Sequence, residues 1–298
     1  VTMEAFQDPH LEEIGWHNFL GMNVGQAVLW ASTDVDPKYE NPELTTSEPY
    51  VMGSHATGCG AWCSGPEDVS PDEYFWGYNR MTTVAGLFGA GDAVGGTPHA
   101  FSSGSFTEGR LSAKAACKYI DDGKAEGIVV SQAQIDKRRE EIYKPLETYT
   151  VGRNEIVAGS VNPNYINPRQ GLDRLQKLMD EYCGGFGVNY MTNEKLLQIG
   201  LKKIAILGED LEKVAAEDIH ELLRAWELKH RFLTSESVFQ HTLFRKETRW
   251  PGYYYRGDAM KLDDENWHVL TVSHRDPKTG EYTMEKAPCY HLVGDKEE

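Results

Sequence analysis

Apolar residues recur with helical spacing through the second half of the chain. The spacing predicts a charged helix over residues 131–149 that ends at Pro145, followed by helices over residues 171–183, 193–207 and 210–233. In the last of these the apolar positions form one stripe, made of Leu211, Val214, Ala215, Ile219, Leu222, Leu223 and Trp226. Such a stripe is usually the core of a bundle rather than a ligand site. We therefore expect a bundle of three or four helices.

Shorter apolar patterns flank this region. Residues 11–31 have the pattern of an amphipathic helix interrupted by glycines, and the polar, proline-bearing residues 32–50 predict a loop. Residues 82–90 are β-branched, aromatic and small, which predicts a short strand buried on both faces. Residues 267–287 predict two strands joined by a D-P-K-T-G turn. The fold class expected is α+β.

A glycine-rich stretch, residues 86–110, joins the predicted strand to a helix. Ser105 and Glu108 have the spacing of a capping box, and Gly123 is a suitable C-terminal stop. Glycines let the backbone approach a ligand closely, and the free N–H groups at a helix start favour negative charge. The four loop glycines do not match the G-x-G-x-x-G pattern of phosphate loops; they are Gly89, Gly91, Gly95 and Gly96.

Asp92 lies inside this loop, where its charge would repel a pyrophosphate. A carboxylate there is better suited to accept hydrogen bonds from sugar or polyol hydroxyls. The loop therefore favours the polyol and ring part of a dinucleotide, although a tight structural turn with a capping aspartate explains the same residues equally well. The small residues S-S-G-S-F at the helix start suit an electron-rich carbonyl, such as the pyrimidine edge of a flavin.

The net charge narrows the classes of partner. The 298 residues carry 30 basic and 46 acidic side chains, a formal charge of −16. This balance disfavours nucleic-acid and anionic-membrane binding. No apolar run approaches the length of a membrane span, and the first residues lack the features of a secretory signal, so we expect a cytoplasmic protein.

Five scattered cysteines indicate a reducing compartment rather than a disulfide framework. His55, Cys59 and Cys63 have H-x3-C-x3-C spacing, but the pattern lacks paired C-x2-C ligands and a fourth ligand. We interpret them as ordinary loop and core residues and predict no metal site in this chain.

Three stretches resemble motifs of the fumarate reductase/succinate dehydrogenase flavoprotein family, in the order in which that family carries them. They are YVMGSHAT; VAGLFGAGDAVGG followed by SSGSFTEGRLSAKAA; and KETRWPGYYYRGDAMKLDDENW. The resemblance implies that residues 1–125 form the C-terminal portion of the FAD-binding and capping domains. It further implies a helical domain over 126–244 and a C-terminal segment with the hairpin over 245–298.

The family's N-terminal G-x-G-x-x-G element and most of its capping domain have no counterpart here. The chain thus resembles the C-terminal half of such a subunit, and we do not expect it to hold FAD tightly alone. The implied contacts with flavin come mainly from the backbone, at Gly53, Ser54, Gly91, Ser103, Gly104, Ser105 and Phe106. Asp92 is expected to accept from a ribityl hydroxyl.

Within that family, the sequences around YVMGSHAT and GDAVGGTPHAF resemble those of the members that reduce adenylylsulfate (APS). The implied activity is the reversible, FAD-dependent reduction of APS to sulfite and AMP. Electrons would come from an iron–sulfur beta subunit with 4Fe-4S clusters. The arginine with which fumarate reductases clamp a dicarboxylate is absent, since His99 and Ala100 stand at the matching positions.

His55 is the first candidate catalytic and substrate-binding residue, because an imidazole beside the isoalloxazine can carry charge near neutral pH. His99 is the second candidate. Phe101 and Phe106 would form apolar walls for an adenine ring, with core packing as the alternative for both. Arg249 and Arg256 would support the flavin site or pair with nearby aspartates: Asp258, Asp263 and Asp264.

Two other functions fit the same residues. The chain could be a non-catalytic module that docks an iron–sulfur partner, which the missing FAD element favours. It could also belong to a different flavoprotein oxidoreductase of the same family. Bound flavin would distinguish an enzyme from a docking module. A substrate assay would distinguish an adenylylsulfate reductase from another flavoprotein oxidoreductase.

Overall fold

The computed structural model describes residues 30–32, 34–36, 59–95, 102–153, 162–249 and 254–290. The chain divides into two compact units, Val1–Val51 and Met52–Glu298. In the first unit residues 30–32 are helical, and the Val35 amide donates to the Trp30 carbonyl at 2.9 Å. The other residues of the helix predicted over 11–31 lie outside the described ranges. All elements below belong to the second unit.

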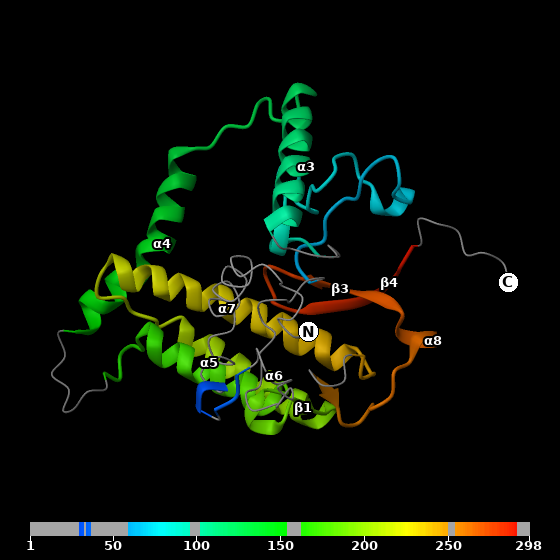
Figure 1. Ribbon diagram of the computed structural model, residues 1–298. Helices are drawn as coiled ribbons and strands as arrows, with labels where there is room; N and C mark the ends of the chain where they lie inside the picture. The colour runs from blue at the N-terminus through cyan, green and yellow to red at the C-terminus, as the bar shows by residue number, and fades with distance from the viewer. Residues whose placement is uncertain are drawn as a thin grey trace. The chain divides into compact units, whose positions relative to one another are not determined.

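A helical bundle forms the main core of this unit. Helices α5 (Pro168–Tyr182), α6 (Glu194–Leu211) and α7 (Ile219–Phe244) lie side by side in Figure 1, and α4 (Gln132–Gly152) packs on α7. Side chains that are at most 2% exposed fill the space between them: Leu197, Ile204, Leu207, Leu228 and Phe239. The bundle expected from the apolar spacing is confirmed.

Polar residues at the helix starts explain why these segments are helical. Asn167 accepts from the Gln170 amide at 2.8 Å in a capping box, and Pro168 occupies the first helical position. Asp218 caps α7 in the same way through the Glu221 amide.

The helix predicted over residues 210–233 is confirmed from Ile219 onward and wrong before it, because α6 ends at Leu211 and α7 begins at Ile219. Between them the Ala215 amide leaves the helical pattern and donates to the carbonyl of Ile166 at 2.9 Å. The break divides the predicted stripe. Its first part is buried, whereas Ile219 is 65% exposed and Leu223 is 55% exposed.

Two further boundaries differ from the prediction. Helix α4 continues through Pro145, which is buried and whose carbonyl accepts from Ala216 at 2.9 Å, so packing offsets the missing N–H. Residues 82–90 do not form a buried strand. Gly86, with φ +79°, turns the chain there, and the Thr82 amide bonds back to the carbonyl of Leu87, which is 55% exposed.

The C-terminal part contains the predicted hairpin. Strands β3 (Val269–Arg275) and β4 (Tyr282–Pro288) are antiparallel, with Val269 opposite Pro288. The other short elements are β1 (Met191–Thr192) parallel to β2 (Tyr255–Arg256), the helix α8 (Asp264–Trp267), and the 3-10 turns η3 (Asp72–Tyr74), η4 (Gly91–Ala93) and η5 (Phe186–Val188).

The end of β4 is bound to η3. The Tyr74 hydroxyl donates to the carbonyl of Pro288 at 2.8 Å, and the Tyr290 hydroxyl bonds to Glu73. The rings of Tyr74 and Tyr290 meet edge to face with centroids 5.1 Å apart. Among the described helices, none is long and apolar enough to cross a membrane.

Candidate functional site

The glycine loop is one of three backbone segments that are hydrogen-bonded to one another: residues 59–65, 80–82 and 88–95. Ala61 donates to Ala93 at 2.7 Å, Gly95 donates to Ala61 at 3.0 Å, and Gly89 donates to Arg80 at 2.9 Å. These long-range bonds fix the loop although it contains little regular structure.

Two glycines are required by packing inside this layer. A Cβ on Gly60 would lie 2.7 Å from the Ala93 carbonyl oxygen, and one on Gly89 would lie 2.7 Å from Val94 Cγ2. Close packing therefore explains why both positions are glycine.

Gly91 is different because its φ of +63° places it in the left-handed region. A Cβ there would lie 3.2 Å from Ser105 Oγ. The absence of a side chain thus brings η4 directly against the first turns of helix α3 (Ser102–Asp121).

The predicted capping box at the start of this helix is wrong. Helix α3 begins at Ser102, so Ser105 lies inside the helix rather than at its cap. Glu108 instead accepts from Arg80 Nη2 at 2.7 Å, and both side chains are largely buried, at 12% and 20% exposed. This ion pair joins α3 to the loop layer. The C-terminal stop at Gly123, with φ +72°, is confirmed.

Asp92 and Phe106 are the exposed side chains of this corner. Asp92 is exposed on η4, and Phe106 on the second turn of α3 is 81% exposed, so its ring is not part of a core in the described chain. Ser103 and Gly104 occupy the first turn of the same helix. Sugar hydroxyls and a polar ring edge fit a free carboxylate beside a helix start.

The described loop layer does not fit a pyrophosphate. Arg80 is the single basic residue in residues 59–95, and its charge is already paired with Glu108. Cationic contacts to a phosphate group would therefore have to come from outside residues 59–95.

A cavity of about 840 Å³ adjoins Asp92 and Gly95 and is bounded on its other side by α7 and β3. There His241 bonds through Nδ1 to Thr271 Oγ1 at 3.0 Å and through Nε2 to Ser273 Oγ at 2.9 Å. Burial, with a smaller effect of the Arg245 charge, lowers the pKa of His241 below its usual value, so the ring is neutral at pH 7. No sequence pattern pointed to this residue, because its environment is created by the packing of α7 on β3.

The other site residues predicted from the sequence divide into two groups. Six of them come together where η4 meets α3: Gly91, Asp92, Ser103, Gly104, Ser105 and Phe106. The remaining candidates lie outside the described residues: Gly53, Ser54, His55, His99 and Phe101.

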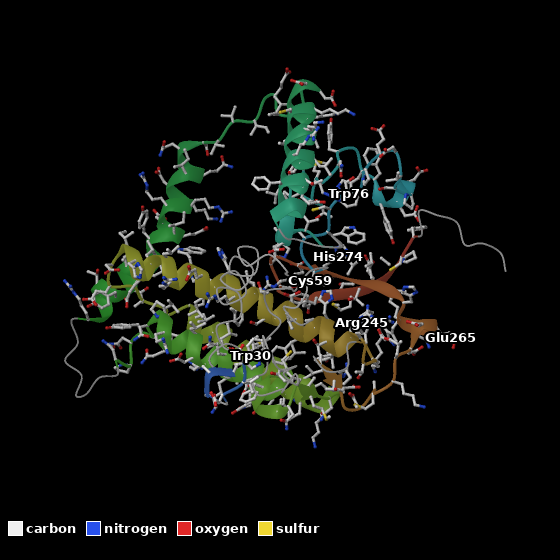
Figure 2. The ribbon with its side chains drawn as sticks, viewed as in Figure 1. Trp30, Cys59, Trp76, Arg245, Glu265 and His274 are labelled. Atoms are coloured by element: carbon white, nitrogen blue, oxygen red, sulfur yellow. The ribbon has the colours of Figure 1, made fainter. Side chains whose placement is uncertain are left out.

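The described cysteines carry no metal arrangement. Cys59, labelled in Figure 2, is exposed, and all five cysteines are free. Burial raises the pKa of the Cys63 thiol, which disfavours the thiolate that a metal needs. In the part of the chain that the structure describes, no three His, Cys, Asp or Glu side chains are grouped to hold a metal ion.

The conspicuous C-terminal arginines are engaged in ion pairs, as one of the two interpretations expected. Arg256 is 1% exposed and donates to both carboxylate oxygens of Asp258, at 2.9 and 3.0 Å. It also donates to the carbonyls of Thr242 and Arg245, at the end of α7. Its guanidinium thus caps the C-terminus of α7, where the helix dipole is negative.

Glu247 is the second centre of this network and was not recognised in the sequence. It is 1% exposed and accepts from Arg249, from Arg245 (Figure 2) and from the amide of Asp263. Burial alone would raise the pKa of Glu247, but these donors outweigh it, and the pKa is lowered. Arg249 also pairs with Asp264 at 2.9 Å.

One family model and several known proteins are similar to this chain. Residues 172–292 match the model of the fumarate reductase flavoprotein C-terminal domain. Adenylylsulfate reductase subunit alpha of Megalodesulfovibrio gigas is 42% identical over 98% of this chain and 45% of its own length. The chain therefore spans about half of the length of this relative.

Solved structures agree with this similarity. Adenylylsulfate reductase from the hyperthermophilic Archaeoglobus fulgidus matches with a TM-score of 0.83 and 48% identity, over 96% of this chain and 45% of its own. A structure of adenosine-5-phosphosulfate reductase with sulfite as a covalent adduct matches equally well. E. coli quinol fumarate reductase shares the fold, with a TM-score of 0.50 and 20% identity. The match covers 73% of this chain and 35% of that chain. Residues 172–292 thus match the C-terminal domain of the fumarate reductase flavoprotein family, and over 98% of its length the chain is similar to adenylylsulfate reductase subunit alpha.

Proposed function

We propose that this chain is part of an FAD-dependent oxidoreductase that reduces adenylylsulfate to sulfite and AMP. The observation that carries the proposal is the 42% identity to an adenylylsulfate reductase alpha subunit along 98% of the chain. In this reaction the bond between sulfur and the bridging oxygen breaks, AMP keeps that oxygen, and the sulfur gains two electrons. The flavin, when bound, supplies those two electrons.

The corner formed by η4 and α3 would hold the flavin from one side. Asp92 accepts a hydrogen bond from a ribityl hydroxyl, and the Gly91 backbone permits close approach. The first turns of α3, with Ser103, Gly104 and Ser105, direct N–H groups toward the electron-rich edge of the ring. The exposed position of Asp92 and the close packing of Gly91 on Ser105 support these roles.

The reaction itself would depend on the two histidines. His55 donates to, or holds positive charge beside, the oxygens of the sulfite and phosphate groups as the bond breaks. His99 is the second donor, Gly53 and Ser54 lie along the ring, and Phe101 joins Phe106 against the adenine. The 81% exposure of Phe106 supports a contact with another molecule at this point.

Two partners complete the proposal. The remaining part of the alpha subunit contributes the cationic contacts of the FAD pyrophosphate, since Arg80 is already paired. An iron–sulfur beta subunit with 4Fe-4S clusters delivers the electrons.

Co-expression of this chain with the remaining part of its subunit tests the proposal. We expect purified material with flavin absorption bands that bleach when sulfite is added, and sulfite release from adenylylsulfate. Asp92→Ala should lower FAD retention, and His55→Ala should retain FAD but lose turnover. Asp72→Ala, an exposed acid on η3, is the matched control. A colourless, inactive complex would support a docking module instead, and a coloured complex inactive on adenylylsulfate would support another flavoprotein of the family.

A further inference from the structure

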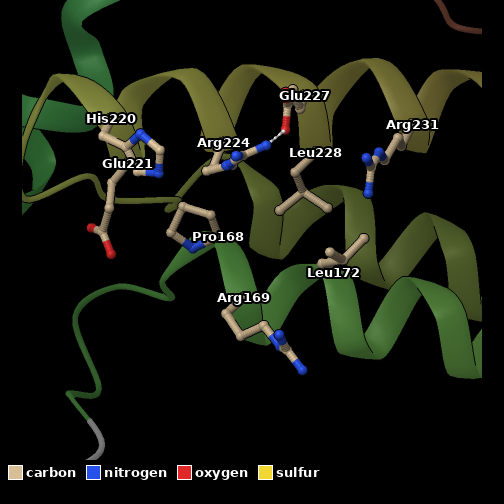
Figure 3. A pocket seen from close by; sticks show the side chains of 9 residues that line it. All are labelled: Pro168, Arg169, Leu172, His220, Glu221, Arg224, Glu227, Leu228 and Arg231. Atoms are coloured by element: carbon tan, nitrogen blue, oxygen red, sulfur yellow. Dashed lines mark hydrogen bonds and ion pairs between the residues drawn. The ribbon is translucent and has the colours of Figure 1, made fainter.

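A hollow of about 350 Å³ lies between the start of α5 and the first half of α7 (Figure 3), and no residue of the glycine-rich stretch 86–110 lines it. Pro168, Leu172 and Leu228 give it an apolar floor. Arginines from both helices stand at its rim: Arg169, Arg224 and Arg231. Pro168 and Arg169 belong to the first turn of α5, and His220 and Glu221 to the first turn of α7, so the positive ends of both helix dipoles lie at one end of this hollow.

The rim arginines can bind carboxylates of another molecule. Arg169 pairs with Asp173 on its own helix at 2.9 Å, and Arg224 pairs with Glu227 at 2.7 Å. Both arginines are more than half exposed, so water screens these pairs and they exchange readily. Arg231 forms no ion pair with any residue that the structure describes.

Two acids also line the hollow and set a limit on its positive charge. The carboxylate of Glu221 accepts a hydrogen bond of 2.8 Å from the amide of Glu217. The hydrogen bond from Arg224, with a smaller effect of Arg231, lowers the pKa of Glu227, which therefore stays ionised. A ligand carboxylate at Arg224 would have to compete with Glu227.

The neighbouring face of α7 is apolar and uncovered. Ile219 and Leu223 lie one turn apart beside His220 and Arg224, and they are 65% and 55% exposed. An exposed apolar patch rimmed by arginine is typical of a protein interface, where arginine is enriched. The lining holds three arginines against two glutamates, and this excess of positive charge, in a chain with a net charge of −16, favours acidic segments.

We infer that the α5–α7 hollow is a docking surface for an acidic peptide segment of a protein partner, which places an aliphatic side chain against Leu172 and its carboxylates at Arg224 and Arg231. The inference does not rest on the proposed function, because no residue of the glycine-rich stretch 86–110 takes part.

Fluorescence anisotropy of a labelled pentapeptide, four glutamates around a central leucine, tests this with the full chain. We expect saturable binding that weakens at least fivefold in Arg224→Glu/Arg231→Glu and at least threefold when glycine replaces the peptide's leucine. Glu227→Gln should tighten binding about twofold, because it removes the competing carboxylate. Arg138→Glu on α4, where the arginine is 77% exposed and pairs with Glu141, is the matched control and should change nothing.

Three results would overturn the inference. Binding that is equal in the double variant and the control would place the peptide elsewhere. Equal binding of the leucine and glycine peptides would show charge attraction without docking. Displacement of the peptide by inorganic pyrophosphate with an affinity greater than the peptide's own would indicate a small-anion site. Circular dichroism of each variant verifies that the helices are intact.

Discussion

Arg256 allows the C-terminal network to be tested by one substitution. Its guanidinium, 1% exposed, donates to both oxygens of Asp258 and to the carbonyls of Thr242 and Arg245. Arg256→Met keeps most of the apolar length of the side chain and removes every donor. The buried carbonyls at the end of α7 then lose their partner.

The magnitude follows from these contacts. An unsatisfied buried acceptor costs about 1–3 kcal/mol, and the loss of one partner of a buried ion pair costs about 3–5 kcal/mol. Asp258 is 34% exposed and can regain water, which places the expected loss near the lower end, at about 3 kcal/mol. Arg256→Lys keeps the charge but not the two-pronged geometry, so about half of that loss is expected.

Urea unfolding followed by circular dichroism measures the free energy of unfolding, and hydrogen exchange reports on the last turn of α7. Arg275→Met is the matched control, because Arg275 pairs with Glu236 at 3.1 Å and is 35% exposed. The control should lose less than about 1 kcal/mol. The reasoning would be refuted if Arg256→Met lost no more than this control and left exchange in α7 unchanged.

Three further predictions concern charge and close packing. The hydrogen bond from Arg256 lowers the pKa of Asp258 from 3.8 to about 2. The stabilisation of the folded state by this pair is therefore present above pH 3.8 and is lost as the pH falls toward 2. Acid titration of unfolding should show this loss in the parent and a smaller one in Asp258→Asn. Gly91→Ala forces a Cβ to φ +63° and to 3.2 Å from Ser105 Oγ, which should cost about 1–2 kcal/mol and speed FAD release from the co-expressed complex, measured by fluorescence. Gly171→Ala places a Cβ 2.5 Å from Leu228 Cδ2, and its overpacking should cost about 1–3 kcal/mol in urea unfolding.

Local signals account for the parts of the fold that the sequence predicted correctly. Helices α5 and α6 carry their own caps and apolar spacing, and the turn of the hairpin is held by Asp276 Oδ1, which accepts from the amides of Lys278 and Thr279. These features are complete within a few residues. They therefore do not depend on the rest of the chain.

The incorrect predictions share a non-local cause. Residues 82–90 have strand-like composition, but in the described chain they form isolated bridges, from Thr82 to Cys63 and from Phe88 to Met81, rather than a strand of a sheet. Glu108 leaves its expected capping role because Arg80, 28 residues away, binds it. Spacing alone cannot show either partner.

The candidate site divides in the same way. The meeting of Gly91 and Asp92 with α3 follows the chain order of loop and helix and was expected. The bonds of His241 to Thr271 and Ser273 join residues 30 and 32 positions apart and were not. His55 and His99 remain predictions from the resemblance.

The bond between Tyr74 and Pro288 spans 214 residues and has a consequence for synthesis on the ribosome. At about 5–20 residues per second, roughly 10–40 s separate the emergence of η3 from that of the strand that holds it. During this interval the bundle can already assemble, because its contacts are close in sequence. The segment around η3 gains its bond to Pro288 only after translation has passed β4, so all the bundle helices of a nascent chain have been synthesised before η3 is anchored.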